Sequence, residues 1–438
     1  MTATAMTGPA PPKDHAELAT ILAGAGDATE TAFAAEALAF LEGHAPRRGP
    51  EALSWGEGSD SVAVFHETTA EEEAAEVAAA RSWQRTRWDA GFGWITGPPD
   101  YGGRGVPPAC DRLYRSLEAL FAVPDMSPLR IGVGTVAPAL MVHGTEEHKR
   151  NYAVGIHRGD MLACQLFSEP EAGSDLAGVR TRATRDGDVW VLDGQKVWTS
   201  NAHLADIGLC LARTDPEAAK HKGLTMFVVP LSTPGMEVRP LRQMTGGASF
   251  TEVFLDGVVL PDRLRVGAEG EGWRVTVSAL TAERGSVGHR SHGLTARMLA
   301  LLRALAAREG LGADPAVRQR LADLEVRLRI ARYHQLRMLA VPPEQLVGPE
   351  GAIDKLLVSA NLTRLGQVAG SLLGPRLVAD TGQWGTYAWA AQVLGAPGMR
   401  LGGGTDEVLK TMLAERLLGL PREPVALEGR GSSGDGGP

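Results

Sequence analysis

Residues 162–179 read Leu-Ala-Cys-Gln-Leu-Phe-Ser-Glu-Pro-Glu-Ala-Gly-Ser-Asp-Leu-Ala-Gly-Val, and the rest of the chain is organised around this stretch. A short apolar run is followed by closely spaced serine, proline, glycine and aspartate, which predicts a buried strand that ends in a compact polar loop. Glycine and small hydroxyls let the backbone come close to a flat or phosphorylated ligand. For the loop taken alone, an ordinary surface turn is the simpler interpretation.

The composition predicts a globular protein with two or three packed regions in its 438 residues. Acidic residues outnumber basic ones, 52 to 44, and no basic stripe carries interleaved aromatics, so we expect no nucleic-acid partner. The cysteines Cys110, Cys164 and Cys210 lie far apart without metal-type spacing, and their odd number suits a reducing compartment. No signal-peptide pattern or membrane-length apolar run is present. We therefore expect a soluble, cytoplasmic protein without a metal site or a membrane span.

The pattern of the chain changes twice, from helical to β and back to helical. Thr69 and Glu72 form a capping box at the start of a helix that runs to Asp89. Gly144 ends a later helix and Thr145 caps the next. The expected regions are a disordered start at 1–13, helices at 14–160, a β domain at 161–272, helices at 273–427 and a disordered tail at 428–438.

Three Asp-Gly dipeptides mark the β region: Asp186-Gly187, Asp193-Gly194 and Asp256-Gly257. We interpret each of them as a hairpin turn, because Asp-Gly favours the positive backbone angles that tight hairpins need. With the apolar or alternating runs between them, they predict a small antiparallel barrel or sandwich. Helical spacing then returns at 273–308, 314–341, 350–380 and 405–419.

The segment Leu-Phe-Ser-Glu-Pro-Glu-Ala-Gly-Ser-Asp within residues 162–179 resembles the signature of the acyl-CoA dehydrogenase family, flavoproteins that desaturate acyl thioesters. Gln-Lys-Val-Trp-Thr-Ser-Asn at 195–201 and the segment from 242–246 to 271–273 resemble two further family elements in the same order. The resemblance implies a mainly α fold with a central β domain. A helical N-terminal domain would precede that domain, and a C-terminal four-helix bundle, which usually also forms the oligomer core, would follow it.

The resemblance also implies that FAD lies between the sheet and the C-terminal helices. Phe167 and Ser168 would border the isoalloxazine ring, Trp198 would pack against it, and Ser174 would face the pyrophosphate or the thioester end of the substrate. Taken alone, a tryptophan is more often a core residue. The full set expected at the cofactor is Phe167, Ser168, Gly173, Ser174, Trp198, Ser200, Thr405 and Glu407.

The catalytic base of many family members is a glutamate in a Tyr-Glu-Gly-Thr motif, and Gly403 stands at that position here. A subset of the family, including isovaleryl and long-chain dehydrogenases, takes its base from the first C-terminal helix, just before an arginine. Glu283 and Arg284 match that position, so the resemblance implies Glu283 as the base and Arg284 as part of the active-site wall. The backbone N–H of Gly403 would still hydrogen-bond the thioester carbonyl.

Helix geometry supports Glu283 independently, because residues three and four positions away share its face. These are Ala279, Leu280, Ser286 and Val287, with no lysine or arginine among them. A small, largely apolar setting of this kind would desolvate the carboxylate and raise its pKa, as a general base requires. The alternative is a solvated glutamate on an ordinary helix.

The predicted activity is therefore oxidation of an acyl-CoA to a trans-2-enoyl-CoA in fatty acid or lipid metabolism, with an electron-transfer flavoprotein as acceptor and a carrier-protein thioester as an alternative substrate. Two other interpretations remain open: a non-catalytic partner subunit, and a flavin oxidase or monooxygenase on the same fold. The family's Arg-x-x-Phe-Gly segment, which contacts a neighbour's dinucleotide, seems replaced by residues 314–320. We thus expect a homodimer, a homotetramer or a hetero-oligomer with a related chain.

Overall fold

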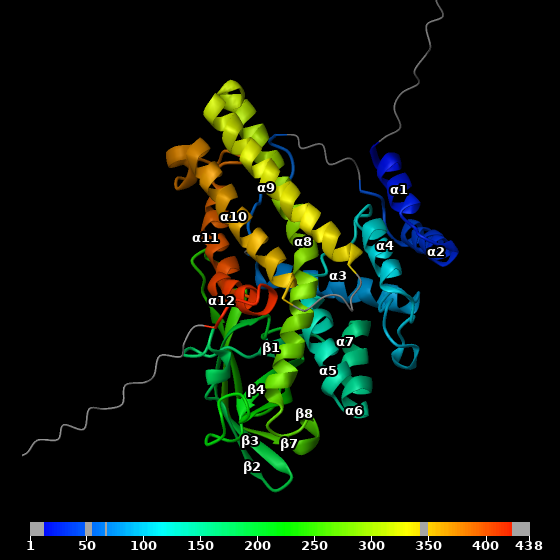
Figure 1. The fold of residues 1–438 in the computed structure, drawn as a ribbon, viewed down its shortest axis with the longest axis vertical. Helices are drawn as coiled ribbons and strands as arrows, with labels where there is room; N and C mark the ends of the chain where they lie inside the picture. Colours follow the sequence, from blue (N-terminus) through cyan, green and yellow to red (C-terminus); the bar gives the residue numbers. More distant parts are fainter. Residues whose placement is uncertain (1–12, 49–54, 66–67, 342–348, 423–438) are drawn as a thin grey trace, which may run out of the picture.

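A computed structural model describes residues 13–48, 55–65, 68–341 and 349–422, with the side chains of 13–17, 284–293 and 339–340 left out. The tail expected to be disordered, 428–438, lies outside these residues, as does the start apart from Lys13. Helices surround a sheet on the side of the C-terminal bundle and on the side of the N-terminal helices (Figure 1). This arrangement confirms the mainly α fold with a central β domain.

The N-terminal part is helical, and its best-defined start is the capping box. Glu72 N donates to Thr69 Oγ1 (3.2 Å) and Thr69 N donates to Glu72 Oε2 (2.8 Å), which confirms the predicted helix start. Buried aromatics, among them Phe92 and Tyr114, form the core of this part. The helices are α1 (Lys13–Ala23), α2 (Ala28–His44), α3 (Ala70–Asp89), α4 (Pro108–Glu118), α5 (Ala137–His143), α6 (Glu146–His148) and α7 (Val154–Arg158).

The sheet is mixed rather than purely antiparallel. Its hydrogen-bonded order is β6-β7-β3-β2-β4-β5-β8, and β1 pairs with β4. Both β1 and β2 run parallel to β4, while the other pairs are antiparallel. The strands are β1 (Ala163–Leu166), β2 (Arg182–Asp186), β3 (Val189–Ser200), β4 (Ile207–Arg213), β5 (Leu224–Pro230), β6 (Met236–Leu241), β7 (Phe250–Pro261) and β8 (Arg265–Val266).

Only one of the three predicted Asp-Gly hairpin turns is a turn. Asp186-Gly187 connects β2 and β3, with Gly187 at φ 59°. The other two predictions are wrong, because Asp193-Gly194 lies inside β3 and Asp256-Gly257 inside β7. The pairing of these strands shifts register there, and Asp193 Oδ1 accepts a hydrogen bond from Gly257 N (2.9 Å). Glycine here accommodates a bulge in a long strand instead of a chain reversal.

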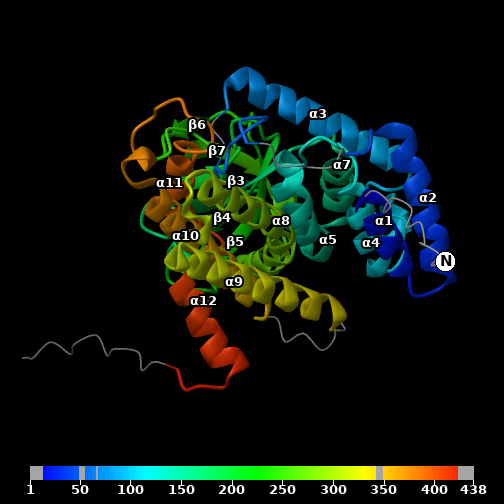
Figure 2. The ribbon, with the colours of Figure 1, turned by 90° about the horizontal axis from the view of Figure 1, so that it is seen from above.

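Helix α8 (Gly272–Arg308) runs through the middle of the molecule and joins its two cores (Figure 1). Val275 and Ala279 pack into the core of the sheet, and Met298 and Leu302 into the core of the bundle. Viewed from above, α9 (Pro315–Ala340) and α10 (Gly351–Leu373) lie across α8 (Figure 2). The predicted helix at 350–380 therefore ends earlier than expected.

Helix α11 (Ala388–Leu401) was not predicted. Glycines and an internal proline, Pro397, made its sequence resemble a loop. Packing overrides this local preference, because Trp389 and Gln392 are buried in the bundle. The last helix, α12 (Asp406–Met412), follows a glycine-rich loop. None of the helices in the described ranges is long and apolar enough to cross a membrane.

Candidate active site

The two family motifs predicted to border the flavin lie side by side. Phe167 follows the end of β1 and is 3% exposed, with half-buried Ser168 next to it. Val197 N on β3 donates a hydrogen bond to Ser168 O (2.9 Å). This bond places the end of the first motif directly against the strand that carries Trp198.

A buried ion pair ties these segments together. Lys196 Nζ, on a fully buried side chain, donates to Phe167 O (3.1 Å), Glu169 Oε1 (2.8 Å) and Leu211 O (2.7 Å). The Glu169 carboxylate also accepts two backbone N–H groups, from Arg180 (2.6 Å) and Thr181 (2.9 Å). Burial alone would raise the pKa of Glu169, but Lys196 and these hydrogen bonds lower it on balance. The sequence analysis assigned no role to this pair.

Trp198 has an unusual backbone and an exposed ring. Its φ is 59°, in the left-handed region that side chains other than glycine rarely adopt, and the β3–β7 register shifts between Lys196 and Thr199. The side chain is 59% exposed, and its ring makes an edge contact with Phe250 at 6.0 Å. The strand is therefore distorted in a way that presents a flat aromatic face at the surface.

The remaining predicted cofactor residues of the β domain lie around this face or on the loop beyond β1. Ser200 is half-buried at the end of β3, paired in register with Phe250. Gly173 and Ser174 are exposed in the loop after β1, and a Cβ added to Gly173 would meet nothing within 4 Å. The loop at Gly173 thus leaves room for a ligand, whereas the structure shows no contact between Ser174 and the Trp198 face.

Glu283 and Gly403, predicted as base and carbonyl donor, are brought together from positions 120 residues apart. A Cβ added to Gly403 would lie 4.0 Å from Glu283 Oε1. Glu283 is half-buried on α8, one turn after buried Ala279 and half-buried Leu280. The carboxylate therefore occupies the space beside the position where other family members carry their base. The side chain of Arg284 lies outside the described residues.

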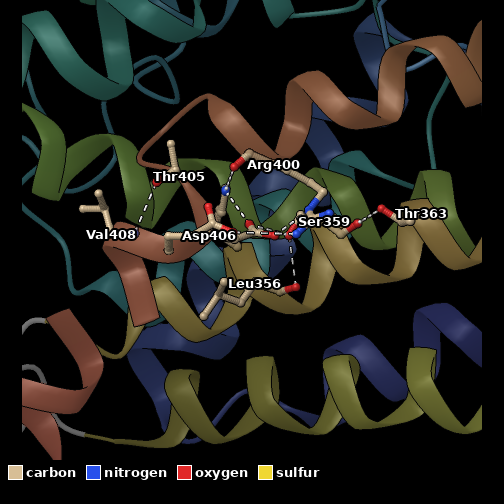
Figure 3. Close-up of polar contacts among 9 residues, drawn as sticks. Leu356, Ser359, Thr363, Arg400, Thr405, Asp406 and Val408 are labelled. Atoms are coloured by element: carbon tan, nitrogen blue, oxygen red, sulfur yellow. Dashed lines mark hydrogen bonds and ion pairs between the residues drawn. The ribbon is translucent and has the colours of Figure 1, made fainter. Parts of the chain in front are cut away.

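Thr405 and Glu407 begin α12, directly after the glycine loop (Figure 3). Thr405 Oγ1 accepts a hydrogen bond from Val408 N (3.2 Å), which confirms the predicted N-cap. The Glu407 side chain is 73% exposed, and its carboxylate lies 4.0 Å from Arg400 Nη2. Thr405 thus lies next to Gly403 and Glu283 along the chain, while Glu407 faces outward.

The expected loss of the Arg-x-x-Phe-Gly segment needs correction. The connection between α8 and α9 begins at the end of α8, and it reads Arg308-Glu309-Gly310-Leu311-Gly312. This segment keeps the arginine and the glycine of the pattern and has leucine in place of phenylalanine. The segment at 314–320 instead forms the N-cap and first turns of α9, where Asp314 Oδ1 accepts a hydrogen bond from Ala316 N (2.7 Å).

A cavity of about 430 Å³ lies elsewhere, between α9, α10 and α12. Its lining contains the cationic side chains Arg327, Arg364, Arg400 and Lys410, but it contains neither Glu283 nor the residues of the Trp198 face. The candidate active site is therefore the region of Phe167, Trp198, Glu283 and Gly403 rather than this cavity.

Comparisons with known proteins agree with this assignment. Family models described as the middle domain and the C-terminal domain of acyl-CoA dehydrogenase match residues 164–258 and 270–418. Acyl-CoA dehydrogenase IpdE1 of Mycobacterium tuberculosis (strain ATCC 25618 / H37Rv) is 37% identical over 344 residues, which cover 78% of this chain and 88% of the relative. Acyl-CoA dehydrogenase FadE34 of the same organism is 40% identical over 328 residues, 73% of this chain and 44% of the relative.

Among solved structures, one titled "Tcur3481-Tcur3483 steroid ACAD" is similar with a TM-score of 0.71 and 28% identity, over 91% of this chain and 99% of the other. The sequence relatives, the family domains and the fold all indicate the same group of proteins. The chain belongs to the acyl-CoA dehydrogenase family of FAD-dependent oxidoreductases.

Proposed function

We propose that this protein oxidises an acyl-CoA to a trans-2-enoyl-CoA with Glu283 as the catalytic base. The observation that carries the proposal is the position of Glu283 Oε1, 4.0 Å from where a Cβ of Gly403 would lie. A carboxylate is thus present where the family places one, although it comes from α8 instead of the loop before α12. A non-catalytic subunit would have no need for this substitution.

The residues near β1 and β3 fit FAD. A flat isoalloxazine ring requires an accessible aromatic or apolar face, and the 59% exposed ring of Trp198 supplies one beside Phe167. The hydroxyls of Ser168 and Ser200 would hydrogen-bond the polar edges of the ring, and the open space at Gly173 leaves the loop free to approach the dinucleotide. The strained backbone at Trp198 supports this interpretation, because strain persists where function needs it.

The chain's own residues would perform the proton chemistry. The Glu283 carboxylate would take the α-proton of the thioester, and the Gly403 backbone N–H would donate to the thioester carbonyl as negative charge develops there. When bound, FAD supplies the hydride acceptor for the β-carbon. One proton and one hydride leave the substrate, so the C–C single bond becomes a double bond.

The acyl group and the assembly are narrowed by what the similar proteins are called. One structure at 28% identity is titled a steroid ACAD and names two chains. We therefore include a ring-bearing acyl-CoA among the substrates to be tested, and we keep a hetero-oligomer with a related chain beside a homo-oligomer. The retained Arg308 and Gly312 favour neither assembly, because either kind of partner can use them. An electron-transfer flavoprotein is the proposed electron acceptor, and a carrier-protein thioester is the alternative to the CoA substrate.

An anaerobic flavin titration tests the proposal. The purified chain with FAD is mixed with straight-chain, branched and steroid side-chain acyl-CoAs while the flavin absorbance is recorded. Bleaching by one substrate class is the expected result and would identify the acyl group. A chain that stays colourless in excess FAD would support the non-catalytic subunit, and the same titration would then be repeated with a co-expressed partner.

Oxygen use distinguishes the remaining alternative. If the reduced flavin reacts with oxygen and hydrogen peroxide accumulates at the rate of substrate oxidation, the protein is an oxidase. If turnover requires an electron-transfer flavoprotein or an artificial dye, it is a dehydrogenase, which is the result we expect.

A further inference from the structure

The loop that carries Gly403 consists largely of glycine, yet both of its ends are held by one buried cluster. Gly403 and Gly404 have φ values of 68° and 92°, so the loop depends on left-handed conformations that glycine adopts freely in the unfolded chain as well. Such a sequence has little intrinsic preference for one structure. Something outside the loop must therefore fix the direction of the Gly403 N–H.

The cluster centres on Asp406, which is 5% exposed. Its Oδ1 accepts hydrogen bonds from Lys355 Nζ (2.9 Å) and Ser359 Oγ (3.0 Å), and its Oδ2 accepts one from Arg400 Nε (2.8 Å). Lys355 Nζ also donates to Arg400 O (3.1 Å). Ser359 of α10 and Arg400 of α11 converge on Asp406 at the start of α12 (Figure 3).

This geometry fixes both ends of the loop relative to each other. Arg400 precedes the three glycines and Asp406 follows them, and a direct ion pair joins the two side chains. Lys355 and Ser359 then attach the closed loop to α10, a helix of the bundle core. Neither residue contacts the substrate position, so the cluster can affect chemistry only by placing the loop.

We propose that Asp406, with Lys355 and Arg400, is a positioning residue that directs the Gly403 N–H toward the thioester carbonyl opposite Glu283. The inference rests on the proposed function, because it assumes that a thioester binds between Gly403 and Glu283. Catalytic donors lose much of their effect when misplaced by about 1 Å, which can cost roughly 100-fold in rate.

The variant Asp406→Asn tests this role, with Asp262→Asn as the matched control. Asp262 also accepts three side-chain donor groups, Trp190 Nε1 (2.7 Å) and two nitrogens of Arg265 (2.9 and 3.0 Å). Trp190 is eight residues from Trp198 along β3, which at roughly 3.3 Å per residue puts the control about 25 Å from the flavin-facing ring. Both variants lose one carboxylate charge, but only one is attached to the Gly403 loop.

Two readouts separate positioning from general destabilisation. The first is the rate constant of flavin reduction by a substrate acyl-CoA, which should fall about tenfold or more in Asp406→Asn and stay within about twofold in Asp262→Asn. The second is the affinity for that acyl-CoA compared with the S-alkyl-CoA of equal length, which lacks the carbonyl. The preference for the carbonyl should be about fivefold in the wild type, as one net hydrogen bond gives, and should largely disappear in Asp406→Asn.

The outcomes distinguish this inference from the proposed function. A wild-type protein that is not reduced and has no preference for the thioester overturns the proposed function. A wild-type preference that Asp406→Asn retains, with an unchanged reduction rate, overturns only the positioning role. If Asp406→Asn does not fold, Ser359→Ala removes one donor while leaving both ion pairs, and its reduction rate should fall about threefold, against no change if the cluster is merely structural.

Discussion

Replacing Lys196 with methionine should destabilise the β domain far more than removing an exposed lysine. Methionine fills a similar volume but removes a charge that is fully buried and donates three hydrogen bonds. The 8% exposed Glu169 carboxylate would be left without its cation. Breaking a buried pair in this way costs about 3–5 kcal/mol, because the remaining charge is uncompensated. We expect a loss of that size in Lys196→Met.

The control is Lys220→Met, in the same domain. Lys220 Nζ lies 2.5 Å from Asp175 Oδ2, but the two side chains are 51% and 64% exposed. Pairs this exposed contribute about 0–1 kcal/mol, since water screens them. The free energy of unfolding of the FAD-free chain, measured in urea for both variants, should therefore differ between them by at least about 2 kcal/mol.

The double variant Lys196→Met/Glu169→Gln tests the reason for the loss. Glutamine removes the uncompensated charge and can still accept a backbone N–H, so the double variant should be more stable than Lys196→Met by about 1–2 kcal/mol. If the double variant is instead less stable than Lys196→Met, the cost does not come from the unpaired carboxylate. If Lys196→Met and Lys220→Met lose equal stability, the reasoning about the buried pair is refuted altogether.

Two further predictions follow from the same region. Trp198→Gly should raise the stability of the FAD-free chain by about 1 kcal/mol, because it relieves a φ of 59° at a side chain that is already 59% exposed; FAD affinity, measured by fluorescence titration, should nevertheless fall at least about tenfold, and unchanged affinity would remove Trp198 from the cofactor site. The pKa of Glu169 is lowered from its ordinary value of 4.5, so its contribution to stability is fully present above pH 4.5 and lost as the pH falls through the folded-state pKa. The stability deficit of Lys196→Met relative to the wild type should therefore narrow in urea unfolding below pH 4.5, and a deficit that stays constant down to pH 3 would contradict this linkage.

The sequence predicted the motifs of the site better than the contacts that hold them. Thr69 with Glu72 and Thr405 predicted helix starts correctly, because capping depends on residues only three positions apart. The pairing of Asp193 with Gly257 could not be predicted in this way, since it joins residues 64 positions apart, and Asp-Gly alone does not distinguish a turn from a bulge. Helix α11 was missed for the same reason, because burial of Trp389 outweighs its glycines and Pro397.

The positioning residues were present in quoted motifs but had no assigned role. Lys196 lies in the second motif and Glu169 in the first, yet only the structure shows that their side chains meet. A lysine inside a largely apolar strand was the available signal, because buried lysines require a partner. Asp406 was similarly visible beside Thr405, but its partners Lys355 and Ser359 come from another helix.

The central claim is that Glu283 is the base, and the most direct test is the anaerobic reduction of bound flavin in Glu283→Gln. Glutamine keeps the size of the side chain but cannot accept the α-proton, so flavin should remain bound with wild-type affinity. The rate of bleaching by the substrate acyl-CoA should fall by about 100- to 10,000-fold, the usual contribution of a general base. Bleaching at the wild-type rate, with FAD bound, would contradict the account and exclude Glu283 from the mechanism.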